Sequence, residues 1–133
     1  MPDLDINYNF TRTFVVSPKV YKVFVEAFDD RNPLHTDEDF ARSKGFKEKV
    51  MHGNILNGFV SYFIGECLPI KNVIIHSQQI QYKNPVYLND ELLFEAFIEN
   101  IYESVNAIEF KFTFKNSELK IVAKGQIQIG LLT

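Results

Sequence analysis

A long apolar segment in the middle of the chain, GNILNGFVSYFIGECL at residues 53–68, constrains the fold more than any other feature of the sequence. Its apolar residues recur at helical spacing and cover most of the circumference of a helix. They are Ile55, Leu56, Phe59, Val60, Tyr62, Phe63, Ile64 and Cys67. Such a helix has to be buried nearly all round, yet it is too short and too often interrupted by polar residues to cross a bilayer. The segment therefore predicts a central helix that other elements enclose.

The second half of the chain alternates apolar and polar residues in the way that is typical of half-buried strands. Residues 108–114 and 119–129 follow this pattern, and the turn-forming residues 115–118 between them predict an antiparallel hairpin. Three further strands are predicted at residues 9–16, 73–82 and 91–100. The sequence therefore predicts a sheet of about five strands.

Helical signals precede the central segment. Ser17 is a suitable N-cap, and proline follows at the first position of a helix predicted from Pro18 to about Phe28. We expect Asn32-Pro33 to stop this helix, so the stretch DRNPLH lies just past a helix end. Thr36 then predicts an N-cap for a short second helix over residues 37–43.

A sheet that is polar on one face and a helix that is apolar all round have one economical arrangement, in which the sheet curls around the helix. The predicted fold class is therefore α+β, with an antiparallel sheet of about five strands wrapped around a central apolar helix. We expect residues 1–133 to form a single domain. Because the sheet leaves one side of the helix open, we also expect a second copy of the chain to close the structure as a homodimer.

Charge and cysteine content exclude several classes of protein. The formal net charge is −3 and Lys and Arg are scattered, so nucleic acid is not an expected partner. The single cysteine, Cys67, lies in an apolar segment, which indicates a reducing compartment and a buried residue rather than a nucleophile. The first residues, MPDLDINYNF, have neither the basic nor the apolar region of an export signal. We therefore expect a cytoplasmic protein with no membrane partner.

The stretch DRNPLH places Asp30 and His35 five residues apart around an Asn-Pro turn, and the pair His52-Gly53 opens the central helix. Taken one at a time, these residues are ordinary at a helix end or a turn. Taken together they favour an acid/base site, because a carboxylate and an imidazole that titrates near neutral pH can exchange protons with one substrate. Asp, His and Glu do not otherwise cluster at metal-ligand spacing, so no metal is expected.

From Asp30 to Ser61 the chain resembles the MaoC-like, (R)-specific enoyl-CoA hydratase family of hot-dog folds. That family carries an Asp-x-Asn-Pro-x-His motif, then an overhanging segment, then His-Gly at the start of the central helix. The matching residues here are Asp30, Asn32, Pro33, His35, His52 and Gly53. The resemblance implies a hot-dog fold and a hydro-lyase that reversibly adds water, in syn fashion, to trans-2-enoyl-CoA thioesters to give (R)-3-hydroxyacyl thioesters. It implies no cofactor other than the coenzyme A of the substrate.

The resemblance also implies a role for each matching residue. Asp30 and His35 would hold the attacking water and move its protons. The backbone N–H of Gly53, free at a helix N-terminus, would stabilise the negative charge that develops on the thioester oxygen. Asn32 would hold the loop rigid, and Ser61 would lie near the site as a serine does in related hydratases. Asn54 is a departure, because relatives commonly have an apolar residue there.

Alternative functions stay open from the sequence. The same chemistry would serve a dehydratase acting on 3-hydroxyacyl groups of an acyl carrier protein, and a non-catalytic acyl-thioester-binding module would keep the fold without turnover. A hot-dog thioesterase has less need of an Asn-Pro-framed pair. Lys44, Lys47 and Lys49 form a solvated face or, alternatively, meet the phosphates of coenzyme A or an acidic carrier protein. His52 is interpreted as a packing or hydrogen-bonding residue, and His76 as structural.

Overall fold

The computed structural model describes residues 4–133, and residues 1–3 of the expected single domain lie outside the described residues. In chain order the elements are β1 (Asn9–Val15), α1 (Pro18–Phe28), α2 (Pro33–Thr36), α3 (Glu38–Ser43), α4 (Asn54–Tyr62), the π-helical η1 (Phe63–Cys67), β2 (Val73–Tyr82), β3 (Glu91–Tyr102), the 3-10 turn η2 (Glu103–Val105), β4 (Ala107–Lys115) and β5 (Ile121–Leu131). In residues 4–133 no helix is both long and apolar enough to span a bilayer.

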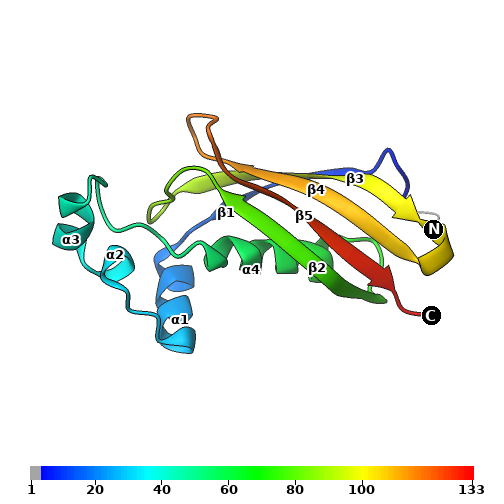
Figure 1. Ribbon diagram of the computed structural model, residues 1–133, viewed down its shortest axis with the longest axis horizontal. Helices are drawn as coiled ribbons and strands as arrows, with labels where there is room; N and C mark the ends of the chain where they lie inside the picture. The colour runs from blue at the N-terminus through cyan, green and yellow to red at the C-terminus, as the bar shows by residue number, and fades with distance from the viewer. Residues whose placement is uncertain (1–3) are drawn as a thin grey trace.

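The strands form one antiparallel sheet of five in the order β1-β3-β4-β5-β2. The sheet curves over α4, which runs along its inner face (Figure 1). The predicted hairpin is β4 and β5, which pair from Ala107 opposite Gly130 to Lys115 opposite Ile121. This arrangement confirms the expected α+β hot-dog architecture of a sheet wrapped around a central helix.

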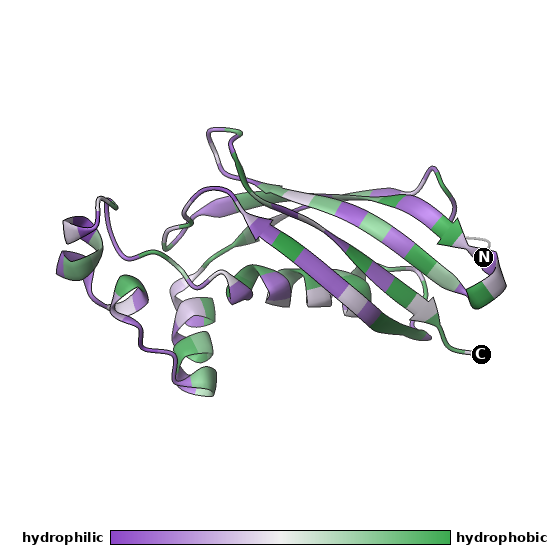
Figure 2. Ribbon diagram, viewed as in Figure 1, coloured by the Kyte–Doolittle hydropathy of each residue, from purple (hydrophilic) through white to green (hydrophobic). Residues whose placement is uncertain are grey.

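Phenylalanine fills the space between sheet and helix. Phe94 of β3 and Phe110 and Phe114 of β4 are fully buried, as the alternation along these strands predicts. Figure 2 shows hydrophobic and hydrophilic residues in turn along the strands of the sheet. Phe63, at the end of the central helix, is also fully buried, and its ring centroid lies 5.2 Å from that of Phe94 and 5.3 Å from that of Phe110. Phenyl rings suit this position because they bury a large apolar area and have no polar atom to satisfy.

The central helix differs from its prediction in two ways. The α-helical part ends at Tyr62, and residues 63–67 continue as a π-helix. Burial all round is wrong for this chain alone, because the sheet covers one face only and the opposite side remains exposed, with Ser61 and Glu66 on the surface and Tyr62 42% exposed. Cys67 is correspondingly half-buried rather than buried.

The segment between β1 and α4 extends beyond one end of the sheet and carries the three short helices α1, α2 and α3 (Figure 1). The N-cap of α1 is Ser17 as predicted, with its Oγ accepting from the N–H of Val20 at 3.1 Å. The helix ends at Phe28 as predicted, but its C-cap is Asp29, whose φ of 55° is left-handed, so the expectation that Asn32-Pro33 stops it is wrong. Asn32 instead caps α2 through a 2.9 Å bond from the N–H of Leu34. Asparagine followed by proline is as good a helix start as a stop.

The cap expected at Thr36 is also wrong. Asp37 caps α3, its Oδ1 accepting from the N–H of Phe40 at 3.1 Å. The hydroxyl of Thr36 donates instead to the carbonyls of Arg31 and Asn32, at 3.1 and 3.2 Å. Thr36 therefore closes the loop that carries Asp30.

Candidate active site

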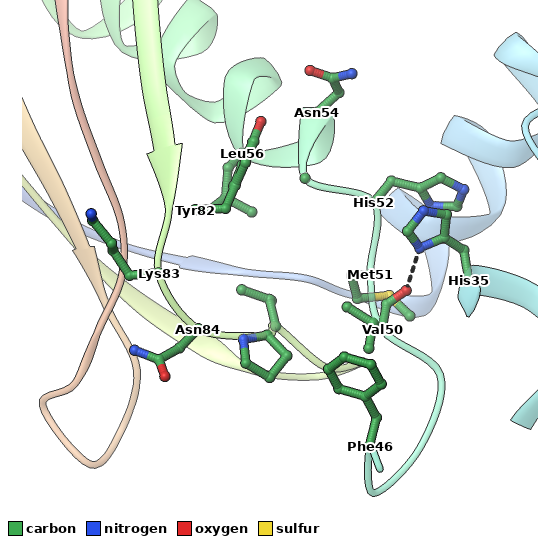
Figure 3. A pocket seen from close by; sticks show the side chains of 13 residues that line it. His35, Phe46, Val50, Met51, His52, Asn54, Leu56, Tyr82, Lys83 and Asn84 are labelled. Carbon is green, nitrogen blue, oxygen red and sulfur yellow. Dashed lines mark hydrogen bonds between the residues drawn. The ribbon is translucent and has the colours of Figure 1, made fainter. Parts of the chain in front are cut away.

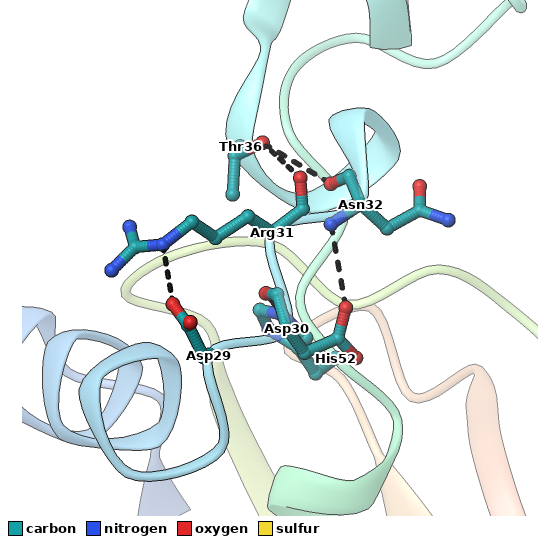
Figure 4. Close-up of polar contacts among 6 residues, drawn as sticks. All are labelled: Asp29, Asp30, Arg31, Asn32, Thr36 and His52. Atoms are coloured by element: carbon teal, nitrogen blue, oxygen red, sulfur yellow. Dashed lines mark hydrogen bonds and ion pairs between the residues drawn. The ribbon is translucent and has the colours of Figure 1, made fainter.

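Asp30 lies in the loop that joins α1 to α2, and this loop is held by hydrogen bonds of its own (Figure 4). Its carboxylate Oδ1 accepts from the backbone N–H of Asn32 at 3.3 Å. The neighbouring Asp29 forms an ion pair with Arg31, 2.7 Å between Oδ1 and Nε, so the Arg31 cation is directed to Asp29. The Asp30 side chain remains exposed and keeps a second oxygen for a ligand.

His35 lies in α2 and is anchored by its ring and by its backbone. Its Nδ1 is 2.7 Å from the carbonyl oxygen of Val50 (Figure 3). Because a carbonyl only accepts, Nδ1 carries the proton and Nε2 of the neutral ring has a free lone pair. The hydroxyl of Tyr21 donates to the His35 carbonyl at 2.6 Å. His35 is therefore a fixed imidazole whose free nitrogen is available as a base.

His52 is 2% exposed and is the one buried polar side chain among residues 4–133. Its Nε2 lies 2.9 Å from the backbone oxygen of Asp30, and its ring centroid lies 4.1 Å from that of His35. Burial lowers the pKa of His52 below its ordinary value of 6.5, and the nearby His35 adds to this, while the Asp30 carbonyl and carboxylate oppose it. His52 is therefore a neutral hydrogen-bonding residue, as the sequence indicates.

Asp30, His35 and His52 thus come together, with one potential ligand atom of each within 4.8 Å of the others. Such a trio is chemically able to bind a divalent cation. The two rings, however, are tilted at 33° to each other, and His35 Nδ1 and His52 Nε2 already have backbone carbonyl partners. The arrangement suits proton transfer better than metal binding, and the absence of a metal stays a prediction.

Gly53 is the N-cap of α4 and lines a hollow of about 460 Å³ together with His35, Met51, Tyr82 and Pro85 (Figure 3). We call this the Gly53 hollow. None of the hydrogen bonds found within residues 4–133 uses the Gly53 N–H. A Cβ at this position would lie 2.7 Å from two carbons of the Tyr82 ring, so glycine is needed for space. The free N–H and the His35 ring thus line the same hollow.

A second hollow of about 990 Å³ lies between α1 and α4, and we call it the α1–α4 hollow. Asp30 lines it beside apolar side chains that include Val20, Phe24 and Phe59. Asn54 lines both hollows, and its Oδ1 accepts from Asn57 Nδ2 at 2.8 Å. The site therefore has an apolar compartment on the Asp30 side and a compartment with a backbone donor on the His35 side.

Two of the predicted site residues lie apart from this centre. Ser61 is on the exposed face of α4 and lines neither hollow. The side chain of Asn32 caps α2 and is exposed, so its part is to shape the loop.

The lysines of the overhanging segment lie over aromatic rings, Lys44 over Phe40, Lys47 over Tyr87 and Lys49 over Tyr21. His76 is bonded to Gln128 in the sheet, away from the site.

Sequence reasoning missed Tyr21, the Val50 carbonyl and Tyr82. Tyr21 donates to a backbone carbonyl and Val50 acts through its own carbonyl, and a bond to a backbone acceptor leaves no mark on the side-chain pattern. Tyr82 reaches Gly53 only through the path of β2 beside α4. A glycine at the start of the central helix hints that another side chain lies close to it, but nothing in the sequence indicates that this side chain is Tyr82.

Comparisons with known proteins agree with this geometry. A family model described as a MaoC like domain matches residues 4–118. The mitochondrial 3-hydroxyacyl-[acyl-carrier-protein] dehydratase of Arabidopsis thaliana is 31% identical over 86% of this chain and 69% of its own length. The (R)-specific enoyl-CoA hydratase of Rhodospirillum rubrum is 28% identical over 75% of this chain and 69% of its own.

Among solved structures, the unliganded (R)-hydratase PhaJ1 of Pseudomonas aeruginosa superposes with a TM-score of 0.87 at 25% identity, covering 98% of this chain and 84% of that one. The family model covers well over half of the chain, and the structural match covers nearly all of it. The chain therefore belongs to the MaoC-like domain family and has the hot-dog fold of its hydratase and dehydratase relatives.

Proposed function

We propose that this protein is a hydro-lyase that reversibly adds water across the C2=C3 bond of trans-2-enoyl-CoA thioesters to give (R)-3-hydroxyacyl thioesters. The observation that carries the proposal is the pairing of a carboxylate with an imidazole whose Nδ1 is committed to the Val50 carbonyl, 2.7 Å away. That bond leaves Nε2 free to accept a proton, and a ring nitrogen of His35 lies within 4.8 Å of a carboxylate oxygen of Asp30. The named activities of the relatives from Arabidopsis thaliana and Rhodospirillum rubrum support the same reaction class.

In the hydration direction, a water held between Asp30 and His35 loses one proton to His35 Nε2 as its oxygen bonds to C3. The C2=C3 electron pair moves toward the thioester carbonyl, and C2 then takes a proton from the Asp30 side of the pair. The C3–O and C2–H bonds that form replace one O–H bond of water and the π bond between C2 and C3. The proton that His35 takes from water makes up for the one that the pair gives to C2, so no electron acceptor is involved. Delivery of both parts of water from one pair gives syn addition.

The Gly53 N–H donates a hydrogen bond to the thioester oxygen and stabilises the negative charge that develops there. It is unused within the described chain, lies at the N-terminus of α4, and lines the same hollow as His35. Helix N-termini favour negative charge because their first N–H groups lack intrahelical partners. A donor that is in place before the charge develops stabilises the transition state more than the ground state.

The two hollows divide the substrate between them. The apolar lining of the α1–α4 hollow suits the acyl chain, and its Asp30 lies where C2 and C3 would be reached. The Gly53 hollow suits the thioester carbonyl and the start of the pantetheine arm. Lys47 and Lys49 adjoin Phe46 and Val50, which line this hollow, and we propose them as the cations for a pantetheine phosphate. In the structure each lies over an aromatic ring.

The alternative function is dehydration of 3-hydroxyacyl groups carried by an acyl carrier protein, and the Arabidopsis thaliana relative specifically favours it. Both reactions use the same atoms of the site, so the structure favours neither. Parallel assays with crotonyl-CoA and with crotonyl-acyl carrier protein separate them. A non-catalytic acyl-binding module would bind without turnover, and a thioesterase would release a free thiol without loss of the enoyl absorbance.

Three further properties belong to the proposal. No cofactor is expected beyond the coenzyme A of the substrate, so dialysis against EDTA should leave turnover unchanged. The location is expected to be cytoplasmic. A homodimer is expected because β2 is at the edge of the sheet and presents Ile74 and Ile75, 52% and 36% exposed, beside the open side of α4. Light scattering during gel filtration should give twice the chain mass, and a monomer would contradict this.

The test of the reaction is the loss of enoyl absorbance with crotonyl-CoA, followed by chiral analysis of the product. Asp30→Asn keeps an acceptor for the Asn32 N–H and loses the acid, and His35→Ala removes the imidazole. Each should lower kcat by at least about 100-fold, within the range of acid/base catalysis, and leave the unfolding midpoint near that of the parent. Asp29→Asn is the matched control, since Asp29 is adjacent and lines neither hollow. A racemic product or an active Asp30→Asn variant would contradict the proposal.

A further inference from the structure

His52 has an unusual combination of bonds for a buried residue. Its Nε2 is 2.9 Å from the Asp30 backbone oxygen, so that nitrogen carries the proton. Its Nδ1 is buried and has no hydrogen-bond partner within the described chain. A buried acceptor without a partner is costly, and an apolar residue would avoid that cost. The ring is therefore of use through its other nitrogen and its faces.

The faces of the His52 ring are occupied on two sides. The ring centroid of His35 lies 4.1 Å away at 33°, and that of Phe24 lies 4.7 Å away at 42°. Figure 3 shows the two imidazoles lying against each other beside α1. His35 is thus held at Nδ1 by the Val50 carbonyl and across its face by His52. Both contacts restrict rotation of the His35 ring about its Cβ–Cγ bond.

These contacts all originate in one short piece of chain. Val50 holds the His35 ring, His52 holds the Asp30 backbone and stacks on His35, and Gly53 follows directly with its free N–H. The two catalytic side chains belong to the overhanging segment, whereas Gly53 belongs to the central helix. Residues 50–53 therefore set the distance between the acid/base pair and the donor for the thioester oxygen.

We propose that His52 is a positioning residue, which fixes the main chain of Asp30 by a hydrogen bond and the ring of His35 by stacking, without taking a proton in the reaction. This rests on the proposed function, because positioning has meaning only for a pair that transfers protons. Outer groups that orient functional residues typically contribute about 10- to 100-fold to activity.

Two substitutions separate the two contacts. His52→Gln keeps an N–H donor at the position of Nε2 but loses the ring, and His52→Phe keeps an aromatic ring but loses the donor. A residue with a merely structural role would tolerate Phe better than Gln, because a phenyl ring can pack against Phe24 and the unpaired Nδ1 would be removed. We expect the His52→Phe protein to unfold at no lower urea concentration than His52→Gln.

The activities should follow the opposite order. We expect His52→Phe to lose about 10- to 100-fold in kcat, with KM within about threefold of the parent, and His52→Gln to lose less. Activity within about twofold of the parent in both folded variants, or a smaller loss in His52→Phe than in His52→Gln, would overturn the proposal.

A readout that needs no turnover comes from NMR of protein labelled with ¹⁵N-histidine. At pH 7 His52 should be a neutral ring protonated at Nε2, and the neutral form of His35 should carry its proton at Nδ1, so that the two adjacent rings are opposite tautomers. A His52 protonated at Nδ1, or at both nitrogens, would overturn the assignment even in an active enzyme. If the tautomers are as expected while the parent fails to convert either crotonyl thioester, the proposed function fails and the contacts of His52 stand.

Discussion

A single methyl group at residue 53 tests the arrangement at the start of α4. The backbone of Gly53 is right-handed, with φ of −58° and ψ of −34°, so alanine fits it without strain. By reducing the freedom of the unfolded chain, Gly53→Ala on its own would stabilise the protein by about 0.4–1 kcal/mol. The obstacle is the ring of Tyr82, 2.7 Å from the added Cβ.

The size of the effect follows from that contact. Ordinary van der Waals contact begins near 3.4 Å, so the Tyr82 ring has to move by about 0.7 Å or more. Because Tyr82 is 50% exposed it can swing outward, but its hydroxyl then loses the 3.2 Å bond from Asn57 Nδ2, which costs about 0.5–1.5 kcal/mol. The two effects offset each other, and the net change in the free energy of unfolding should be within about 1 kcal/mol.

Activity should respond much more than stability. The methyl group lies in the Gly53 hollow beside the free N–H, and a displacement of about 1 Å at a reacting centre can cost about 100-fold. We expect Gly53→Ala to lose about 10- to 100-fold in kcat/KM on crotonyl-CoA, while urea unfolding gives a free energy within about 1 kcal/mol of the parent.

The double variant with Tyr82→Ala separates the two causes. Without the ring, Gly53→Ala should be stabilising, yet activity should remain low because the methyl group still crowds the N–H. Parent-like kcat/KM in Gly53→Ala would refute the role of Gly53. Full recovery in the double variant would assign the loss to Tyr82 instead.

Three other predictions concern stability. Burial lowers the pKa of His52, so between the lowered pKa and pH 6.5 the unfolded chain binds a proton that the folded chain does not. The contribution of His52 to the free energy of unfolding is therefore fully present above pH 6.5 and is lost as the pH falls toward the lowered pKa. The urea midpoint should be lower at pH 5.5 than at pH 7.5, and the difference should be smaller in His52→Phe. Phe63→Ala, in the core, should lose about 3–5 kcal/mol in urea unfolding, whereas Phe97→Ala, 46% exposed, should lose less than about 1 kcal/mol; equal losses would contradict the packing described. Leu119 has a φ of +62° and is 72% exposed, so Leu119→Gly should raise the free energy of unfolding by about 1 kcal/mol, and a loss would show that the left-handed backbone carries no strain.

The sequence predicts the regular elements well because each carries a local signal. The helix at residues 18–28 has both a cap and an apolar face, and the β4–β5 hairpin has strict alternation around a turn. The start of β5 falls at Ile121 rather than Leu119, because the left-handed Leu119 still belongs to the turn. The single domain over residues 1–133 stays a prediction.

The sequence mispredicts an element where two local signals compete, and it misses a contact where one of the partners is a backbone atom. Asn32-Pro33 marks a helix start and a helix stop equally, and only the left-handed Asp29 upstream settles which it is. The motif brings attention to Asp30 and His35, but the bond from His52 to the Asp30 carbonyl depends on how two distant segments meet. A side chain whose role is to bond a distant backbone carbonyl cannot be recognised from the sequence pattern alone.

The most direct test of the account compares Asp30→Asn with Asp29→Asn, two conservative changes at adjacent residues of which only Asp30 lines a hollow. The measurement is the initial rate of enoyl absorbance loss with crotonyl-CoA and with crotonyl-acyl carrier protein, at equal concentrations of folded protein. The account predicts turnover of at least one thioester by the parent and by Asp29→Asn, and a loss of at least about 100-fold in Asp30→Asn. Parent-like rates in Asp30→Asn, or no turnover of either thioester by the parent, would contradict it.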